Sequence, residues 1–246
     1  MIPEDHPRHA ALVVREHLAN AMRRGIVAPE GLIAQGRGEA FDYLLGEQTT
    51  ESAARAERTA AAMLLSARNP VISVNGNTAA LCAAAIADLQ RASGAAVEVN
   101  LFHRTEERMR AITALLAEAG VEVLSGEPER LIPLSHDRAL CLQHGIGAAD
   151  LVLVPLEDGD RCAALRQMGK RVIAVDLNPL SRTAQTATLP IIDEVRRALP
   201  AITAACASLT PAEAEALAAS VDGSVYLHQA IDSIVRRLQE VEHALE

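Results

Sequence analysis

Short apolar runs recur through the middle of the chain, and helical patterns separate most of them. Six runs are visible: VISV at 71–74, AVEV at 96–99, VEVL at 121–124, LVLV at 151–154, VIAV at 172–175 and the weaker LPII at 189–192. Several are continuously apolar and rich in Val and Ile, which is typical of strands buried on both faces. Helical segments are expected at 79–93, 105–119 and 159–168. This alternation predicts an α/β fold with a mostly parallel sheet and helices on both faces.

The segment before the first run contains a loop rich in glycine and charge. Helical stretches at about 8–24 and 50–68 flank this loop, which carries Gly36-Arg37-Gly38 followed by Glu39. Glycine lets the backbone come close to a ligand. An arginine held there offers a planar fork of donors to a phosphate or a carboxylate. The alternative, a surface turn with a solvated Arg–Glu pair, explains the motif equally well.

C-terminal helices follow the last run. After the segment 194–207 comes TPAE at 210–213, a capping box with proline at the first helical position. An apolar stripe then recurs at helical spacing, as expected for a core or dimer contact; it comprises Ile231, Ile234, Leu238, Val241 and Leu245. No repeat or linker is visible. We therefore expect one domain, 1–246, with an N-terminal helical segment 1–69, a core 70–195 and C-terminal helices 196–246.

Composition excludes several classes of function. Half of the 246 residues are hydrophobic, which predicts a packed core. A net charge of −9, two Tyr, two Phe and no Trp argue against nucleic-acid binding, which needs a basic surface and often stacking rings. The four cysteines form no CxxC pair, so neither a zinc site nor a disulfide framework is expected. The sequence shows no signal peptide and no apolar run of membrane-spanning length, and we expect a soluble cytoplasmic protein.

Polar residues crowd the positions directly after the predicted strands. In an open parallel sheet, ligands bind beyond the carboxyl ends of the strands, so these residues form the candidate site. They are Asn75, Gly76 and Asn77 after the first run, His103 and Arg104 after the second, Glu157, Asp158 and Asp160 after the fourth, Asp176, Asn178 and Arg182 after the fifth, and Asp193 after the sixth.

Each cluster has a structural alternative. The turn 75–77 either presents backbone N–H groups to an anion at a helix N-terminus or is a simple βα turn. Asp158 and Asp160 are either oxygen ligands for Mg²⁺ or N-caps of the next helix. The segment 176–178 either contacts a nucleotide or forms an Asx-turn, and His103 is either a proton acceptor or structural. Generic motifs do not decide, because no P-loop is present and GIGAAD at 145–150 precedes a strand.

Longer stretches are more specific. IPEDHPRHAALVVRE, GIVAPEGLIAQGRGEAFDYLLGE, PVISVNGNTAAL, VNLFHRTEER, LVLVPLEDGDR and VIAVDLNPLSRTA resemble the archaeal phosphopantothenate synthetase family, the 4-phosphopantoate–β-alanine ligases. The resemblance runs from residue 2 to about 195. It implies a Rossmann-like fold, a homodimer, and an ATP-dependent reaction that joins 4-phosphopantoate to β-alanine and releases AMP and pyrophosphate. The product feeds coenzyme A biosynthesis.

The resemblance also assigns residues. Carried over by position, the family's ATP contacts fall on Arg15, Arg37, Asp176, Leu177, Asn178, Arg182, Thr183, Glu194 and Val195. Two positions differ from the family pattern. Gln35 stands where the family loop usually has histidine, and the pair 194–195 is typically Asn-Ile. An asparagine side-chain hydrogen bond is therefore not carried over to Glu194, whereas a backbone contact at this position would survive the change.

An acyl adenylate mechanism needs cations, a metal, a second anion site and a proton acceptor. We expect Arg37, with Glu39 or His103 as the acceptor, to act in catalysis. Asn75, Gly76, Asn77 and Arg104 are the candidates for the substrate phosphate, and Asp158 and Asp160 for Mg²⁺. Two rival functions use the same fold. A nucleotide-dependent kinase or phosphoryl transferase would release ADP, and a non-catalytic nucleotide sensor would bind ATP without consuming it.

Overall fold

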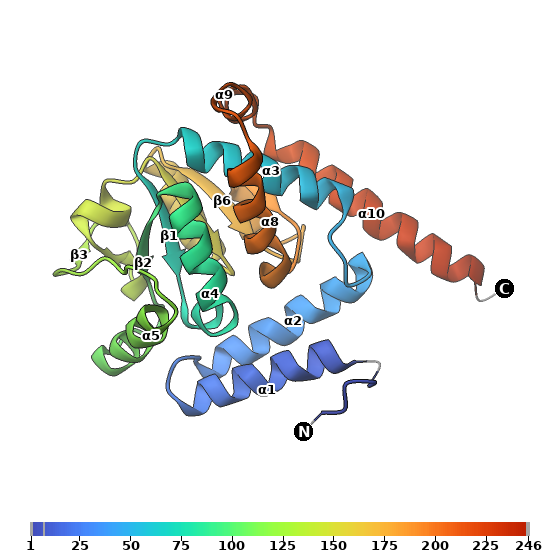
Figure 1. Ribbon diagram of the computed structural model, residues 1–246, viewed down its shortest axis with the longest axis horizontal. Helices are drawn as coiled ribbons and strands as arrows, with labels where there is room; N and C mark the ends of the chain where they lie inside the picture. Colours follow the sequence, from blue (N-terminus) through green and yellow to red (C-terminus); the bar gives the residue numbers. More distant parts are fainter. Residues whose placement is uncertain (1, 7, 245–246) are drawn as a thin grey trace.

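A parallel five-stranded sheet lies at the centre of the molecule (Figure 1). The computed structural model describes residues 2–6 and 8–244. The strands are β1 (Pro70–Val74), β2 (Ala96–Val99), β5 (Leu151–Pro155), β6 (Arg171–Val175) and β7 (Leu189–Ile191), arranged in the order β2-β1-β5-β6-β7. Every neighbouring pair in this sheet is parallel. The predicted α/β fold is confirmed.

The sheet is covered on both faces, because alternate side chains of each strand point to opposite sides. Ile72 and Leu153 face one core, shared with α3 (Glu51–Ser66), α4 (Gly76–Ser93) and α8 (Val195–Ser208). Val71 and Val152 face the other core. That second core also includes residues of α6 (Gly159–Gln167) and of the segment 132–149. Burial on both faces explains why the strands read as continuous apolar runs.

One prediction at the edge of the sheet is wrong. The run 121–124 forms no strand; it makes one isolated bridge, Val97 to Val123, and the chain turns away at Gly126, where φ is +153°. Beyond it lies a short antiparallel pair that the sequence pattern did not predict, β3 (Glu129–Arg130) and β4 (Leu140–Cys141). Each of these strands is two residues long, which is too short to show an alternating pattern.

The predicted Gly-Arg-Gly loop is also wrong. Residues 36–38 lie inside a continuous helix, α2 (Pro29–Leu45), which follows α1 (His9–Arg23). Proline at the start of α2 and Gly46 in the left-handed region at its end (φ 90°) fix the two ends of the helix. Each internal glycine weakens a helix by about 1 kcal/mol relative to alanine, but tertiary packing overrides that preference. Figure 1 shows α1 and α2 lying side by side below the sheet.

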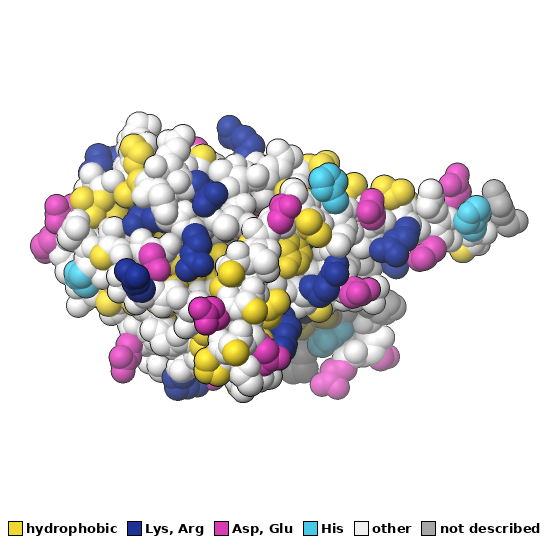
Figure 2. Space-filling model, turned by 90° about the horizontal axis from the view of Figure 1, so that it is seen from above, with side chains coloured by type: hydrophobic (Ala, Val, Ile, Leu, Met, Phe, Trp, Pro, Cys, Tyr) yellow, Lys and Arg dark blue, Asp and Glu magenta, His cyan; other side chains and the backbone are white. Residues whose placement is uncertain are grey.

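The C-terminal helices agree with the predictions. Thr210 and Glu213 form both bonds of the capping box that begins α9 (Pro211–Ala219). The last helix, α10 (Gly223–Ala244), projects beyond the body of the molecule (Figures 1 and 2). Ile234 packs in a small core with residues of α2, whereas Val235, Leu238 and Val241 are exposed. Leu245 of the predicted stripe lies outside the described residues.

Two further observations concern the described residues only. All four cysteines are buried free thiols. Among the helices described, none combines the length and apolarity needed to cross a membrane.

Candidate active site

A cavity of about 750 Å³ opens beyond the carboxyl ends of the strands. Helix α2 forms one wall, and the segments after β1, β2, β5, β6 and β7 form the others. Gly31, Ala34, Gly38 and Phe41 of α2 line the cavity at helical spacing, so one face of this helix is turned toward the sheet. The following predicted site residues line the cavity: Arg37, Asn75, Gly76, Asn77, His103, Asp158, Asp176, Leu177, Asn178, Arg182, Thr183, Glu194 and Val195.

We call the part of the cavity formed by α2 and the segments 176–183 and 194–195 the β6–β7 end. Here Asp176 accepts hydrogen bonds from the backbone N–H of Asn178 (3.0 Å) and from the hydroxyl of Ser181 (2.5 Å). The Asx-turn considered from the sequence is therefore present. Burial raises the pKa of Asp176, and the hydrogen bond from Ser181 works against that shift.

Two arginines at the β6–β7 end are available to a ligand. Within the described chain, the Arg37 and Arg182 side chains make no hydrogen bond and no ion pair, although the charge of Arg37 acts on the carboxyl of Asp176. Guanidinium groups in this state keep all five donors for an anion. The two arginines share one cavity, whereas Arg15, the third arginine that the resemblance assigned to ATP, is not among its lining residues.

The carboxylate of Glu194 is engaged by its own helix. It caps α8 by accepting from the backbone N–H of Arg196 (3.0 Å), and it also accepts from the guanidinium of that residue (3.1 Å). Burial raises the pKa of Glu194, and the charge of Arg196 opposes the shift. The side chain is thus committed, and the backbone N–H of Glu194 is engaged as well, because it donates to the Asp193 carboxylate (2.7 Å).

We call the opposite part of the cavity, formed by the turn 75–77, residues 101–103, Arg108 and Arg138, the β1–β2 end. Asn75 accepts from the backbone N–H of Thr78 (3.0 Å) and donates to the carbonyl of Leu156 (2.9 Å), so it is the cap of a βα turn. Asn77 donates to the carbonyl of Gly31 on α2 (2.8 Å). A Cβ at Gly76 would lie 2.2 Å from the Ile26 carbonyl oxygen, so only glycine fits there.

Two arginines at the β1–β2 end were not singled out from the sequence. Arg108 donates to the carbonyls of His103 and Ile26, and its Nε is buried without a hydrogen-bond partner. Arg138 is 6% exposed, in a short 3₁₀ turn at 137–139. Asn100, directly after β2, donates to the carbonyl of Leu140 (2.9 Å) and so ties this turn to the sheet.

The acidic cluster after β5 is paired with basic residues. Glu157 lies 2.9 Å from Arg138 and also pairs with Arg161, which is fully buried. Burial acts to raise the pKa of Glu157, but the charges of Arg138 and Arg161 outweigh it and lower the pKa. Asp158 lies 3.0 Å from the Arg138 Nε. These ion pairs form the floor of the cavity, by which we mean Arg138, Glu157, Asp158 and Arg161 between the β1–β2 end and the β6–β7 end.

The structure bears on the predicted metal ligands in two ways. Across residues 2–6 and 8–244, no group of three or more His, Cys, Asp or Glu side chains is arranged to hold a metal ion. Asp158 lines the cavity, and its Oδ2 is buried with no aligned hydrogen-bond donor. Asp160 is not among the lining residues; it accepts from His136 (2.9 Å). A Mg²⁺ ion at Asp158 would need phosphate oxygens or water for its other ligands.

Arg15 and Glu39 lie apart from the cavity and contact each other. Glu39 accepts from Arg15 (2.8 Å), Arg8 (2.9 Å) and Tyr43 (2.9 Å). Burial acts to raise the pKa of Glu39, but the hydrogen bonds from Arg15 and Tyr43 lower it. Positions 37 and 39 are about 200° apart around a helix, so Glu39 faces away when Arg37 faces the cavity.

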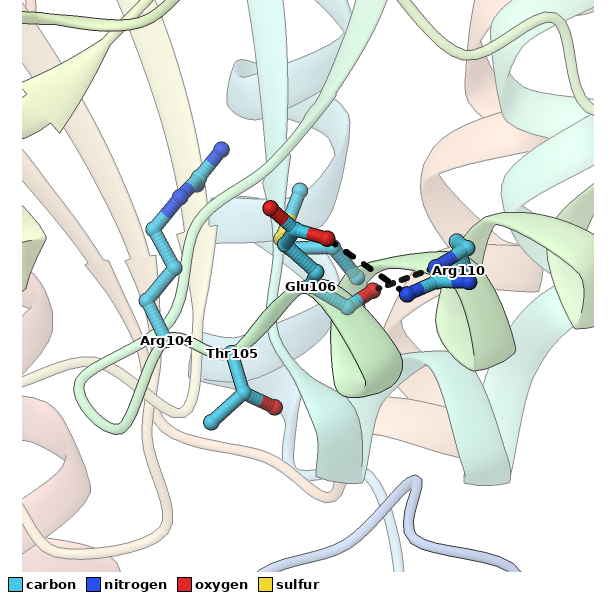
Figure 3. A pocket seen from close by; sticks show the side chains of 5 residues that line it. Arg104, Thr105, Glu106 and Arg110 are labelled. Carbon is cyan, nitrogen blue, oxygen red and sulfur yellow. Dashed lines mark hydrogen bonds and ion pairs between the residues drawn. The ribbon is translucent and has the colours of Figure 1, made fainter.

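Arg104 lines a different, shallow cavity of about 440 Å³ at the start of α5 (Glu106–Glu118). Figure 3 shows its side chain extending away from the ion pair of Glu106 and Arg110. His103 does line the main cavity, 3.8 Å from Glu30 and edge-on to the Phe102 ring. The structure thus brings His103, and not Arg104, to the predicted site.

Comparison with known proteins adds independent information. Residues 52–237 match the family described as phosphopantothenate/pantothenate synthetase. The chain is 59% identical over 241 residues to the 4-phosphopantoate–beta-alanine ligase of Methanospirillum hungatei, covering 98% of this chain and 99% of the relative. It is 57% identical over 199 residues to that of Methanosarcina mazei (80% and 79%) and 52% identical over 202 residues to that of Thermococcus kodakarensis (81% and 77%).

Proposed function

The chain belongs to the phosphopantothenate/pantothenate synthetase family, and on that premise we propose that it joins 4-phosphopantoate to β-alanine with ATP, releasing AMP and pyrophosphate. The observation that carries this proposal is the single cavity with arginines at both ends. In a chain of net charge −9, local positive charge of this kind favours anionic ligands. The triphosphate of ATP and the phosphate of a phosphorylated acid provide one anionic group for each end of the cavity.

We place ATP at the β6–β7 end, where Arg37 and Arg182 have all their donors available and where Asp176, Leu177 and Asn178 line the cavity. The 4-phosphate of phosphopantoate lies at the β1–β2 end, held by Arg108 and Arg138. These two arginines take the role that the sequence suggested for Arg104. Their guanidinium groups are close enough that Arg138 lowers the pKa of Arg108, after burial as the larger cause. An anion between them relieves that repulsion.

The substrate carboxylate then lies between the two ends, next to the α-phosphorus. Its oxygen attacks this phosphorus, the bond to the β-phosphate oxygen breaks, and pyrophosphate leaves. The amine of β-alanine attacks the acyl carbon of the adenylate, AMP leaves, and the nitrogen loses a proton. Catalysis of such steps rests on positioning and on neutralising the phosphate charge, which Arg37 and Arg182 supply.

Two groups complete the mechanism. Mg²⁺, bound through Asp158 and the ATP phosphates, would supply further positive charge at the leaving group. His103 is the lining residue that we assign as the acceptor of the amine proton. Asp160 would support the Asp158 loop through His136, and Glu39 has no part in the chemistry because it faces away from the cavity.

One assay separates this function from its rivals. The protein is incubated with ATP, Mg²⁺, 4-phosphopantoate and β-alanine, and the nucleotide products are separated by chromatography. We expect AMP, pyrophosphate and 4'-phosphopantothenate, with amide product lost when β-alanine is omitted. Formation of ADP would indicate the phosphoryl transferase, and ATP binding without turnover would indicate the sensor. Either result would contradict the ligase proposal.

A homodimer is part of the proposal. The exposed apolar residues Val235, Leu238 and Val241 lie on the projecting part of α10, which Figure 2 shows extending from the body with yellow hydrophobic side chains between charged ones. An exposed apolar stripe on a helix suits contact with a second copy. Light scattering should give twice the 26.1 kDa chain mass, and a monomer at micromolar concentration would contradict this part.

A further inference from the structure

A buried pair of acids lies behind the β6–β7 end of the cavity. Glu57 of α3 and Asp193 at the junction of β7 and α8 are 2% and 1% exposed, and their side chains are hydrogen-bonded to each other. Two carboxyl groups that share a hydrogen bond in an interior without water do not both ionise. The pair therefore holds one proton and one negative charge.

The hydrogen bonds show which acid is charged. Asp193 accepts from the Thr49 hydroxyl (2.6 Å), from the backbone N–H of Glu194 (2.7 Å) and from Nε of Arg197 (2.9 Å). Oε1 of Glu57, by contrast, has no hydrogen-bond partner. Donors gather around the ionised group, so the charge sits on Asp193 and the proton on Glu57. Burial, followed by the charge of Asp193, raises the pKa of Glu57 to about 9.

This acid pair connects two walls of the cavity. Arg197 binds Asp193 and also the carboxylate of Asp42 on α2 (3.1 Å), the helix that carries Arg37. Asp193 directly precedes Glu194, which lines the cavity. A change in the charge of Glu57 therefore alters contacts that hold both α2 and the start of α8.

Charged groups on the other elements packed against α3 are engaged elsewhere. Glu213 of α9 pairs with Arg58 (3.1 Å), and the Tyr226 hydroxyl of α10 lies 2.9 Å from the hydroxyl of Thr59. The charges that act on Glu57 are those of Asp193 and, in opposition, Arg197. No second cation is available to Glu57 among these contacts.

We propose that Glu57 is a positioning residue whose protonated carboxyl group donates a hydrogen bond to the Asp193 carboxylate and so holds the Asp193–Arg197–Asp42 contact, and with it the two walls of the nucleotide end, in place. Loss of this proton would leave two carboxylates competing for Arg197, so that α2 and the start of α8 separate. The inference rests on the proposed function only in taking ATP as the ligand of this end.

The first test compares Glu57→Gln and Glu57→Leu, with Glu118→Gln on the exposed face of α5 as the matched control. Glutamine still donates to Asp193, so its KM for ATP should match wild type at pH 7. Leucine fills the space without a donor and should raise that KM about tenfold, the order expected for a lost buried hydrogen bond. Equal increases in the KM for ATP in Glu57→Gln and Glu57→Leu would overturn the proposal.

The second test is the pH profile. In the wild type, Glu57 gains its charge as the pH rises through about 9, so KM for ATP should rise between pH 8 and 10. In Glu57→Gln this rise should be absent. Superimposable profiles of wild type and Glu57→Gln would overturn the proposal even if Glu57→Leu did not fold.

A third readout does not involve ATP. The infrared difference spectrum, wild type minus Glu57→Gln at pH 7, should contain the carbonyl stretch of a buried protonated carboxyl group. Its absence would overturn the assignment of the proton whatever reaction the protein catalyses. If the band is present but AMP is never formed, the ligase proposal fails and the assignment of the proton stands.

Discussion

The two ends of the cavity hold their arginines in different ways. At the β6–β7 end, Arg37 and Arg182 have neither a hydrogen-bond acceptor nor an ion-pair partner among the described residues, whereas at the β1–β2 end Arg108 and Arg138 are fixed by backbone carbonyls and carboxylates. Unattached guanidinium groups are able to follow phosphates whose positions and charges change during a reaction. Fixed ones suit a group that is bound and does not react. We therefore propose that the β6–β7 end is the reacting end, which serves the chemistry, and that the β1–β2 end is the anchoring end, which holds the substrate.

The largest expected effect comes from removing the charge between the two ends. Glu157→Gln leaves the buried guanidinium groups of Arg138 and Arg161 without their carboxylate. Breaking a buried ion pair in this way costs about 3–5 kcal/mol, and we expect the free energy of unfolding in urea to fall by that amount. Asp160→Asn, which removes the more exposed pair with His136, should cost less than about 1 kcal/mol. Similar losses in the two variants would mean that the floor is not held by Glu157.

The anchoring end is tested by Arg108→Met and its neighbour Arg104→Met. We expect Arg108→Met to raise KM for 4-phosphopantoate about a hundredfold, because charge-assisted bonds to the phosphate are lost, with KM for ATP unchanged. Arg104→Met should change neither constant, since Arg104 lines a separate cavity. Steady-state kinetics with each substrate varied in turn measures both. A rise in KM for 4-phosphopantoate that occurs only in Arg104→Met would contradict the assignment of Arg108, and would favour Arg104 as the sequence predicted.

At the reacting end, Arg37→Lys keeps the charge but removes the planar fork of donors. We expect kcat/KM for ATP to fall tenfold or more, which is about 1.4 kcal/mol. The matched control is Arg110→Lys, on the exposed face of α5, which should behave as wild type. Near-normal kinetics in Arg37→Lys would count against the assignment of this end to the triphosphate.

The smallest effects distinguish the two glycines beside Arg37. A Cβ at Gly36 meets no atom within 4 Å, and Gly36 does not line the cavity, so Gly36→Ala should stabilise α2 by about 0.5–1 kcal/mol without loss of activity. A Cβ at Gly38 lies 3.3 Å from Leu177 on the cavity wall. Gly38→Ala should raise KM for ATP a few-fold. Thermal unfolding and steady-state kinetics of Gly36→Ala and Gly38→Ala measure these effects. Identical stability and KM in the two variants would contradict the prediction.

The sequence analysis singled out the arginines that line the β6–β7 end but missed those that line the β1–β2 end, for a physical reason. Asp176, Asn178 and Arg182 follow directly after a strand, and the rule for parallel sheets places such residues at a ligand site. Arg108 comes from the first turn of a helix, and Arg138 from an irregular turn tied down by Asn100. Their approach to the cavity depends on long-range packing that no local pattern contains.

The Gly-Arg-Gly motif shows the same limit. Local preference favours a loop at 36–38, because two glycines weaken a helix. Contacts made elsewhere, such as the hydrogen bond from Asn77 to the Gly31 carbonyl, hold α2 against the sheet as a helix. The pairing of Glu39 with Arg15 could not be foreseen either, because these residues are joined only when α1 and α2 pack together.

The most direct measurement is a crystal structure of the protein with a non-hydrolysable ATP analogue and 4-phosphopantoate bound together. We predict that the triphosphate lies within about 3 Å of donors on Arg37 and Arg182. The monoester phosphate should contact Arg108 and Arg138 at the opposite end, with the carboxylate facing the α-phosphorus. A complex in which the monoester phosphate occupies the Arg37 end, or binds at Arg104, would contradict the division of this cavity into a reacting end and an anchoring end.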